Sequence, residues 1–502
     1  MKLSELLWGL EISETNIEDL NIEIGNICDD SREVEKGDLF IALAGHSCDG
    51  HGYINEALER RAAVIVIERK ECSGDFQYIR VPSTRIAYAT LWSNLCGRPA
   101  DRMRMIAVTG TNGKSTVVSM IEHILSCSGR KVSTIGTLNS SLTTPDPCEL
   151  YPRLKELADS GIEFVVMEAS SHALELEKLR PIFYEIAAFT NLTRDHLDFH
   201  GTMEAYAAAK AKLFCSCDTG LYNYDDDYIR RIAGEGNAKK LFYSAKQRIA
   251  DFTAENIQTQ IAKSRFDFLS EGELFRIEMP LTGDHNVSNA LCAVSVCRIL
   301  GVDKNTIRTA MSSMKGISGR MERVDITSTD YKAFIDYAHT PDALYKVLSA
   351  LRNCMNKENR LICIFGCGGD RDRGKRKEMG AIASALSDLC IITSDNSRSE
   401  DPYMIIRDIL SGVEKDSRYL IIENRERAIQ YAVHTAKAGD VLVFCGKGHE
   451  SYEINAYGKT EFNEKKIIQD ADKERNRIKG NEYNSRRQDE NVSCRNSKNN
   501  RR

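Results

Sequence analysis

The chain has 502 residues, of which 42% are hydrophobic and 28% are charged, and its formal net charge is −5. The length fits about three domains of ordinary size, and the composition is typical of a soluble globular protein. The charge gives no sign of nucleic-acid binding, no apolar run reaches membrane-spanning length, and acidic residues interrupt the N-terminus, so we expect neither a membrane helix nor a secretion signal.

Sixteen cysteines are many for such a chain. Cys292, Cys297, Cys363 and Cys390 lie singly in apolar segments, without the paired spacing of a metal site. Such placement is typical of reduced, buried thiols, which predicts a cytoplasmic protein.

Residues 1–100 predict a small α/β domain, because strands at 39–43 and 63–67 alternate with a helix at 57–61. A polar loop bounded by glycines, 45–50, lies between these segments. On its pattern alone, this loop either binds a ligand or only connects two elements.

Residues 101–320 predict a central domain organised around a phosphate-binding loop. A buried strand at 105–108 precedes Gly110-Thr111-Asn112-Gly113-Lys114-Ser115-Thr116, and a helix follows with one apolar face that ends at Ser128-Gly129. Glycines aim backbone N–H groups at an anion, Lys114 can reach phosphates, and Ser115 or Thr116 can ligate Mg²⁺. Only two residues separate the glycines, where the general motif has four, so a plain glycine turn is the alternative.

Polar residues follow the next strands of this domain. The strand at 132–135 leads to Thr143-Thr144-Pro145, the strand at 164–167 ends at Glu168, and the strand at 186–190 leads to His196. Carboxyl ends of parallel strands share one edge, and a carboxylate there suits Mg²⁺. A solvated glutamate and a structural histidine are the alternatives. A helix at 203–214 carries Lys210 and Lys212, which the pattern alone reads as solvated lysines.

Residues 321–476 predict a third α/β domain with strands at 333–335, 361–365, 390–393 and 441–445, each ending in a polar loop. Four such loops at one sheet edge favour ligand binding. Residues 477–502 are polar, lack aliphatic periodicity and predict a disordered tail.

Several of these segments together resemble the Mur ligase family, in its muramyl-tripeptide (MurE-type) branch. The resembling segments are DSRxVxxGxLFxAxxGxxxDG, GTNGKST, TNLxxDHLDFHGxMxxYxxAKxxLF and GxHNxxNALxA. The resemblance covers about residues 1–470. It implies a central doubly wound parallel sheet, flanked by a small N-terminal α/β domain and a C-terminal Rossmann-like α/β domain.

The resemblance also implies an activity. The family branch uses ATP and Mg²⁺ to join a diamino acid, here meso-diaminopimelate, to UDP-N-acetylmuramoyl-L-alanyl-D-glutamate through an acyl phosphate, in peptidoglycan precursor synthesis. We therefore expect an ATP-dependent acid–amino-acid ligase whose partners are these small molecules, acting as a monomer without nucleic acid.

Residue by residue, the resemblance assigns four groups of site residues. The catalytic group is Lys114, His196 and Lys210, the last as a carbamate, and the metal group is Ser115, Glu168, His196 and Lys210. The ATP group is Gly110 to Thr116, with Asn289, Arg320, Asp336 and His339. The UDP-muropeptide group is Ser31, His46, Ser47, Thr143, Thr144, Ser170 and Lys178, and the amino-acid group is Arg371, Asp395, Asn396, Arg398, Gly446 and Glu450.

The chain departs from the family pattern at three positions. Leu176 and Lys178 stand where a glutamine and an arginine hold the muropeptide, and Ser397 replaces the proline of Asp-Asn-Pro-Arg. Diaminopimelate is expected because Arg398 is kept and suits a second carboxylate; in the alternative, Arg398 only pairs with Glu400 or Asp401 in a surface turn. A lysine-adding ligase, a folylpolyglutamate synthase-like ligase, a P-loop kinase or GTPase, and a non-catalytic nucleotide-binding module are the other readings.

Overall fold

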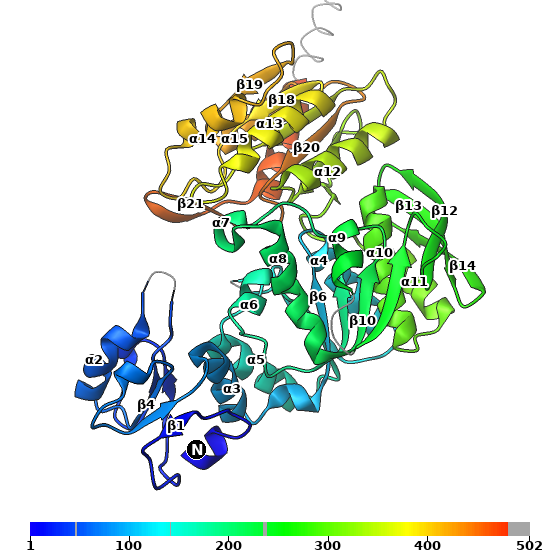
Figure 1. Cartoon of the computed structure of the whole chain (residues 1–502). Coiled ribbons are helices and arrows are strands. Elements are labelled where there is room, and N and C mark those ends of the chain that lie inside the picture. Colours follow the sequence, from blue (N-terminus) through cyan, green and yellow to red (C-terminus); the bar gives the residue numbers. More distant parts are fainter. Residues whose placement is uncertain (46–47, 141, 234–237, 480–502) are drawn as a thin grey trace, which may run out of the picture.

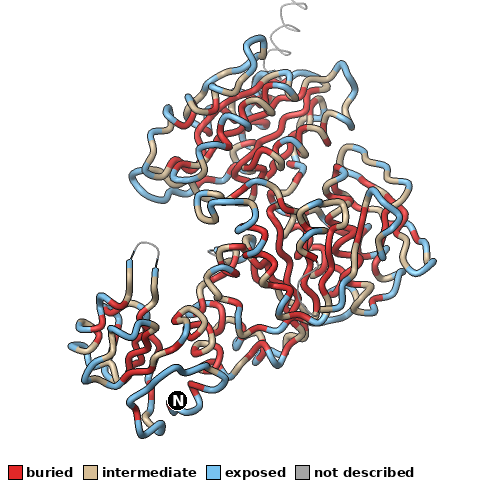
Figure 2. The backbone as a smooth tube through the Cα atoms, in the orientation of Figure 1, coloured by how far each residue is buried: buried red, intermediate tan, exposed pale blue. Residues whose placement is uncertain are grey.

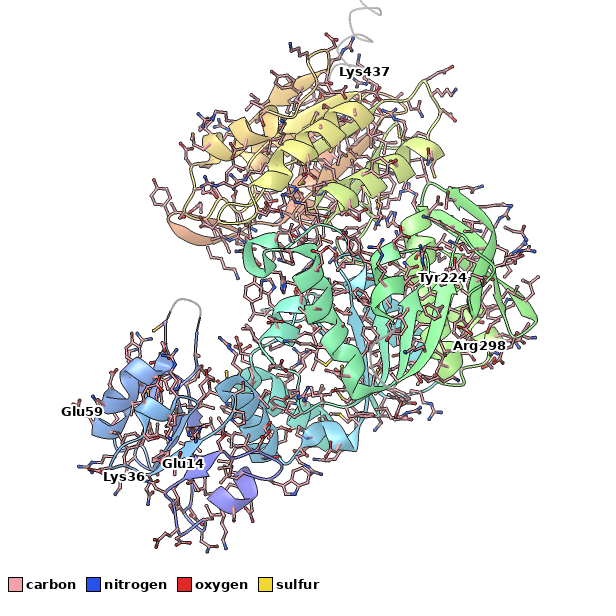
Figure 3. The ribbon with its side chains drawn as sticks, viewed as in Figure 1. Glu14, Lys36, Glu59, Tyr224, Arg298 and Lys437 are labelled. Carbon is pink, nitrogen blue, oxygen red and sulfur yellow. The ribbon has the colours of Figure 1, made fainter. Side chains whose placement is uncertain are left out.

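The computed structural model describes residues 1–45, 48–140, 142–233 and 238–479. It has three lobes that follow one another along the chain (Figure 1). The strands of their three main sheets lie within 14–80, 104–279 and 322–445, so the predicted boundaries at 100 and 320 fall between sheets. In Figure 3 the labelled residues mark the lobes: Glu14, Lys36 and Glu59 lie on the first, Tyr224 and Arg298 on the second, and Lys437 on the third.

The first lobe contains a five-stranded sheet in the order β1-β5-β4-β3-β2. The strands are β1 Glu14–Thr15, β2 Ile27–Cys28, β3 Leu39–Ile41, β4 Val64–Ile67 and β5 Tyr78–Arg80, and the helices are α1 Leu3–Leu6, α2 Ile54–Glu59 and α3 Thr84–Leu95. The helix predicted at 57–61 starts three residues earlier and ends at Glu59, because Arg61 adopts a left-handed conformation with φ 68°.

The second lobe contains a nine-stranded sheet in the order β14-β13-β12-β11-β10-β9-β6-β8-β7. The strands are β6 Arg104–Thr109, β7 Val132–Ile135, β8 Phe164–Glu168, β9 Tyr184–Phe189, β10 Cys217–Asn223, β11 Lys239–Ser244, β12 Phe252–Gln260, β13 Lys263–Ser270 and β14 Glu273–Met279. The helices are α4 Lys114–Cys127, α5 Pro147–Asp159, α6 Ser171–Glu175, α7 Leu197–His200, α8 Met203–Ala211, α9 Asp227–Ile232, α10 Asp284–Ile299 and α11 Lys304–Ser313.

The prediction of a parallel central sheet is correct for β6 to β12 and misses an antiparallel extension. β12, β13 and β14 pair antiparallel through two short turns. Ala262 and Glu271 take φ values of 63° and 50° in these turns, and Gly272 takes 79°. Short turns of this kind connect antiparallel neighbours, whereas parallel strands need a longer crossover.

The third lobe contains a six-stranded sheet in the order β15-β16-β20-β17-β18-β19 and a separate hairpin. The strands are β15 Glu322–Arg323, β16 Lys332–Asp336, β17 Leu361–Phe365, β18 Leu389–Ile392, β19 Tyr419–Ile421, β20 Val441–Cys445, β21 Tyr452–Asn455 and β22 Gly458–Glu461. The helices are α12 Pro341–Cys354, α13 Gly374–Leu386, α14 Pro402–Leu410 and α15 Arg425–His434. All four predicted strands of this domain are confirmed.

A last helix covers 464–479, so regular structure continues past residue 476, where the tail was predicted to begin, and the rest of that segment lies outside the described residues.

Most parallel strands of the three main sheets are buried, and buried segments, drawn in red in Figure 2, run through all three lobes. The apolar face of α4 packs on the central sheet, with Val117, Met120, Ile121 and Ile124 fully buried. The four cysteines predicted to be buried, Cys292, Cys297, Cys363 and Cys390, are buried free thiols. In the described part of the chain, no helix is both long and apolar enough to cross a membrane.

Candidate active site

The phosphate-binding loop joins β6 to α4, and its geometry requires glycine at two positions. Gly110 and Gly113 have φ values of 142° and 86°, and a Cβ on Gly113 would lie 2.3 Å from Asn289 Oδ1. Lys114 Nζ donates to the carbonyl oxygens of Gly110 and Thr111, each at 2.9 Å. Burial lowers the pKa of Lys114. With the first N–H groups of α4, the loop forms a concavity suited to an anion.

Glu168 ends β8 beside this loop and is only 1% exposed. Its Oε1 accepts a hydrogen bond from the backbone N–H of Thr137 at 2.8 Å, and its Oε2 accepts one from the Thr137 hydroxyl at 3.2 Å. None of the ion pairs within the described ranges includes Glu168. A buried carboxylate without a cationic partner is suited to binding a metal ion.

Lys210 reaches the same loop from α8 and is 1% exposed. Its Nζ donates to the Gly110 carbonyl oxygen at 2.9 Å and lies 4.8 Å from the centre of the Tyr206 ring. Burial, with the Lys114 charge, holds the pKa of Lys210 well below its usual value. Lys212 differs, because its ammonium pairs with Glu175 and Glu177 at 3.0 Å.

His196 precedes α7 in a left-handed conformation, with φ 54°. Its Nε2 lies 3.4 Å from Asp195 Oδ2, and the His172 ring meets its ring edge-on at 4.7 Å. Burial lowers the pKa of His196 to about 3, although Asp195 acts in the opposite direction. The imidazole is therefore neutral at ordinary pH.

The residues assigned to a divalent cation could bind one if Lys210 is carbamylated. Ser115, Glu168 and neutral His196 supply oxygen and nitrogen donors, but Lys210 as an ammonium would repel a cation. A neutral amine reacts with carbon dioxide to give an anionic carbamate, so the lowered pKa of Lys210 suits that change. Across the described residues, no group of three or more His, Cys, Asp or Glu side chains is placed to hold a metal ion.

The third lobe closes over the loop through several side chains. Arg320 Nη2 donates to Ser115 Oγ at 3.1 Å, and its guanidinium lies 4.5 Å from the centre of the Tyr337 ring. Asn112 Nδ2 donates to Asp342 Oδ2 at 2.9 Å, which ties the loop directly to the start of α12.

Two more predicted nucleotide residues lie beside this contact. Asp336 ends β16 and accepts from the backbone N–H groups of Met321 and Ala338 at 2.7 and 2.8 Å. Burial raises its pKa. His339 Nδ1 lies 2.8 Å from the Tyr337 carbonyl oxygen, and burial lowers its pKa to about 4.

The loops after β18 and β20 form a second polar cluster. Asn396 Nδ2 donates to Glu450 Oε2 at 2.8 Å, and Asn396 Oδ1 accepts from Lys447 Nζ at 2.9 Å. A Cβ on Gly446 would lie 2.5 Å from Asp395 Oδ2, so only glycine allows this approach. Burial acts to raise the pKa of Asp395, yet the charges of Lys447 and then Arg425 hold it lowered.

The side chain of Arg398 enters the same cluster. Its Nη1 donates to the carbonyl oxygens of Gly369 and Asn396 at 2.8 and 3.3 Å. Burial, then the charge of Arg371, lowers its pKa. Arg398 belongs to none of the ion pairs formed by described residues.

The surface-turn alternative for Arg398 is therefore not the observed arrangement. Glu400 pairs with Arg376 and Arg373 at 2.8 and 3.1 Å. Asp401 instead caps α14, where its Oδ1 accepts from the Tyr403 backbone N–H at 2.9 Å.

One cleft of about 950 Å³ between the second and third lobes brings most of the predicted residues together. Its walls include the phosphate-binding loop from Thr111 to Thr116, Thr143, Glu168, His196, Asn289, Arg320, Asp336, His339, Arg371, Asp395, Asn396, Arg398, Gly446 and Glu450. Gly110 and Lys210 lie just beneath this surface, where they contact each other.

Four predicted muropeptide residues lie apart from the walls of this cleft. Thr144 donates to the Glu168 carbonyl oxygen at 2.9 Å, and Ser170 caps α6 by accepting from Ala173 N–H at 3.2 Å. Lys178 pairs with Asp146 at 2.5 Å. Ser31, in the first lobe, donates to Glu56 at 2.7 Å. His46 and Ser47 lie outside the described residues.

The sequence analysis assigned no role to Asp195, Asp342 or Lys375, which also line the cleft. Asp195 is next to His196 in the DHLD segment, which was a usable signal. Asp342 and Lys375 lie in the first turns of α12 and α13, and their approach to the second lobe depends on how the lobes pack.

Models of one protein family match three successive parts of the chain. The Mur ligase family catalytic domain matches residues 23–89, the Mur ligase middle domain matches 108–297, and the Mur ligase glutamate ligase domain matches 319–448. These parts lie in the first, second and third lobes.

Curated relatives match almost the whole chain. A UDP-N-acetylmuramoyl-L-alanyl-D-glutamate–2,6-diaminopimelate ligase of Clostridium tetani is 40% identical and covers 94% of this chain and 99% of its own. The corresponding ligases of Syntrophomonas wolfei and Clostridioides difficile are 40% and 37% identical, covering 93% and 94% of this chain and 98% and 99% of their own.

Solved structures agree with this. A structure of the same kind of ligase has a TM-score of 0.67 at 31% identity and covers 95% of this chain and 99% of its own. MurF of Thermotoga maritima in complex with ADP has a TM-score of 0.57 at 19% identity, covering 86% and 96%. A Mycobacterium tuberculosis folylpolyglutamate synthase has a TM-score of 0.60 at 18% identity, covering 72% and 92%. The last two show a shared fold.

Proposed function

The chain belongs to the Mur ligase family, and from this premise we propose that it joins meso-diaminopimelate to UDP-N-acetylmuramoyl-L-alanyl-D-glutamate in an ATP-dependent ligation. One observation carries the proposal. A single cleft contains a phosphate-binding loop, a buried carboxylate and a cluster suited to a zwitterionic amino acid, and these come from two lobes. Peptidoglycan precursor synthesis is the process that this reaction serves.

The chemistry requires an activated carboxylate. A carboxylate is a poor acyl donor, so the γ-phosphoryl group of ATP first passes to the D-glutamyl carboxylate and gives an acyl phosphate. The amine of the second substrate then attacks the acyl carbon, and phosphate leaves. The protein mainly has to orient three ligands and neutralise phosphate charge.

The phosphate side of the cleft supplies that neutralisation. Lys114 and the N–H groups at the start of α4 would hold the phosphates, while Arg320 bridges from the third lobe to Ser115. Ser115, Glu168, His196 and carbamylated Lys210 would hold Mg²⁺, which when bound neutralises phosphate charge. Asn289, Asp336 and His339 would bind the nucleotide, since they line the same end of the cleft.

The other side of the cleft suits the diamino acid. Glu450 and Asp395 would accept hydrogen bonds from an ammonium group, and Arg371 and Arg398 would pair with carboxylates. Diaminopimelate carries one more carboxylate than lysine, and the Arg398 guanidinium has no carboxylate partner among the described residues. An arginine without a carboxylate partner favours the substrate that brings the extra carboxylate.

The nucleotide-linked substrate would extend from the cleft toward the first lobe. Thr143 lines the cleft, and Ser31, Thr144, Ser170 and Lys178 remain proposed contacts, as do His46 and Ser47 outside the described ranges. Lys178 already pairs with Asp146, so contact with the muropeptide requires it to share or leave that partner. We also propose a cytoplasmic location, because ATP and the nucleotide-linked substrate are cytoplasmic metabolites, and we propose that the protein acts as a monomer.

One assay tests the function. The purified chain is mixed with ATP, Mg²⁺ and UDP-N-acetylmuramoyl-L-alanyl-D-glutamate, with meso-diaminopimelate, with L-lysine or with neither, and ADP and product mass are measured. We expect a tripeptide product and matching ADP release with diaminopimelate. Equal or better use of lysine would assign the chain to lysine addition, and no product with either would contradict the ligase assignment.

A further inference from the structure

Lys375, in the first turn of α13, is a buried cation of the cleft without a partner. It is 8% exposed and lines the cleft. Within the described residues, no hydrogen bond and no ion pair reaches its ammonium. Its neighbours differ, because Arg376 pairs with Glu400 and Asp408 and Arg373 pairs with Glu400. Lysines this buried normally have an anionic partner, so Lys375 is suited to an anion that enters the cleft.

The start of α13 abuts the second lobe, which places Lys375 at the junction of the lobes. A Cβ on Gly374 would lie 2.7 Å from Arg194 Nη2, and Arg194 Nη1 donates to Glu378 Oε1 at 3.1 Å. Gly374 and Glu378 are on α13, which Figure 1 shows in the third lobe, whereas Arg194 follows β9 of the second lobe.

The start of α13 lies toward the phosphate side of the cleft. It contacts Arg194, and the backbone N–H of the preceding residue, Thr193, donates to Thr111 Oγ1 of the phosphate-binding loop at 3.0 Å. Burial, then Lys375, lowers the pKa of His339 to about 4. Two cations from different lobes, Lys114 and Lys375, line the cleft together with Asp195.

This position favours phosphate over the amino acid as the ligand. The amino-acid cluster has its own two arginines, Arg371 and Arg398, for carboxylates. Lys375 instead follows Gly374, which lies against the loop after β9, and that loop is hydrogen-bonded to the phosphate-binding loop. A phosphoryl group held above Lys114 would meet a second cation from the third lobe.

We propose that Lys375 is a catalytic residue that binds a non-bridging oxygen of the phosphoryl group as it passes from ATP to the D-glutamyl carboxylate. The proposal rests on the proposed function. In this step a carboxylate oxygen forms a bond to the γ-phosphorus, and the bond between that phosphorus and the bridging oxygen breaks. ADP leaves with the electron pair. Lys375 keeps its protons and neutralises charge on the transferred oxygens.

Closure of the lobes then becomes a requirement of phosphoryl transfer itself. Lys114 is fixed in the second lobe and Lys375 in the third, so both cations reach the same phosphoryl group only when the lobes meet. Amino-acid binding and phosphate activation are thereby linked through α13 and its lobe.

The test compares Lys375→Met with Lys377→Met. Methionine keeps the length and apolar stem of lysine, and Lys377 is an exposed lysine of the same helix. Acyl phosphate formation is measured without the diamino acid, by trapping with hydroxylamine. ATP affinity, steady-state kcat and KM for diaminopimelate, and the thermal midpoint are measured beside it.

We expect Lys375→Met to slow acyl phosphate formation and kcat together by about 10²–10³-fold, the loss found when one preorganised donor to a transition-state oxygen is removed. ATP affinity should change less than about threefold, Lys375→Arg should recover part of the rate, and Lys377→Met should match the wild type.

Three results would overturn the proposal. These are an unchanged rate of acyl phosphate formation in a folded Lys375→Met variant, a higher KM for diaminopimelate at unchanged rate, and a loss that follows only from a lower thermal midpoint without recovery by arginine. Failure of the proposed function is distinguishable, because then the wild type and Lys377→Met would also make no tripeptide.

Discussion

Replacing Arg398 tests the choice of amino acid most directly. The guanidinium is half-buried, donates only to two backbone carbonyl oxygens, and has a pKa lowered by burial and by Arg371. A substrate carboxylate at this place would form two charge-assisted hydrogen bonds, each worth about 1.5–3 kcal/mol. Because the site is partly solvated, we take about 3–4 kcal/mol for the pair, which is roughly 10²–10³-fold in kcat/KM.

We therefore expect Arg398→Ala to lower kcat/KM for meso-diaminopimelate by roughly 10²–10³-fold, with little change for L-lysine. The assay is competition between the two amino acids at a fixed concentration of the nucleotide substrate, with products separated by mass. Selectivity should collapse mainly through the loss of diaminopimelate use.

Two further variants separate charge from backbone effects. Arg398 has φ 51°, a left-handed conformation that asparagine tolerates better than alanine, so Arg398→Asn should behave like Arg398→Ala. Arg373→Ala is the matched control, because Arg373 is exposed and pairs with Glu400 at the surface, where ion pairs contribute little. Unchanged diaminopimelate use in both Arg398 variants, or equal use of lysine by the wild type, would refute the reasoning.

Three other substitutions test the phosphate side of the cleft. Lys114→Ala should abolish ligation at an unchanged circular-dichroism melt, and wild-type turnover would count against the loop assignment. Lys210→Ala should be nearly inactive and regain part of its activity with added short-chain carboxylates, and a plain ammonium at Lys210 in an active, Mg²⁺-loaded crystal would exclude the carbamate. Gly113→Ala should weaken ATP binding at least tenfold in calorimetry, because its Cβ would meet Asn289 Oδ1 at 2.3 Å in a left-handed conformation; unchanged affinity would show that the loop relaxes.

The sequence predicted the parallel strands well because each one is a short apolar run ending in polar residues. β17 and β20 have the predicted bounds, 361–365 and 441–445, β6 is one residue longer at each end, and β8 is one residue longer at its C-terminal end. Such strands are buried on both faces, so their pattern does not depend on tertiary detail. β13 and β14 were missed because charged residues such as Arg265 and Arg276 alternate with buried ones, so neither strand contains a continuous apolar run.

The sequence identified the cleft residues that directly follow a strand. It did not identify the cleft residues on helices that pack against another lobe. Glu168 and Asp395 follow parallel strands, so the sheet edge brings them to the cleft wherever the lobes lie. Lys375 and Asp342 reach it only because α13 and α12 face the second lobe, and no local pattern encodes that packing. Thr144 and Ser170 are a different case, because their hydroxyls form hydrogen bonds within the fold and their muropeptide contacts stay predictions.

The charges of the cleft explain why residues such as Lys375 were missed. A core position can be recognised from the apolar pattern of its own helix or strand, because that pattern marks the buried face. An unpaired buried cation such as Lys375 is unfavourable in the free protein and has a purpose only with a ligand and a second lobe present. Lys114, Lys210 and Arg320 also belong to none of the ion pairs formed by described residues, and each was recognised from a motif rather than from its surroundings. A residue of this kind outside any motif becomes visible only when the structure shows both its burial and its missing partner, as it does for Lys375.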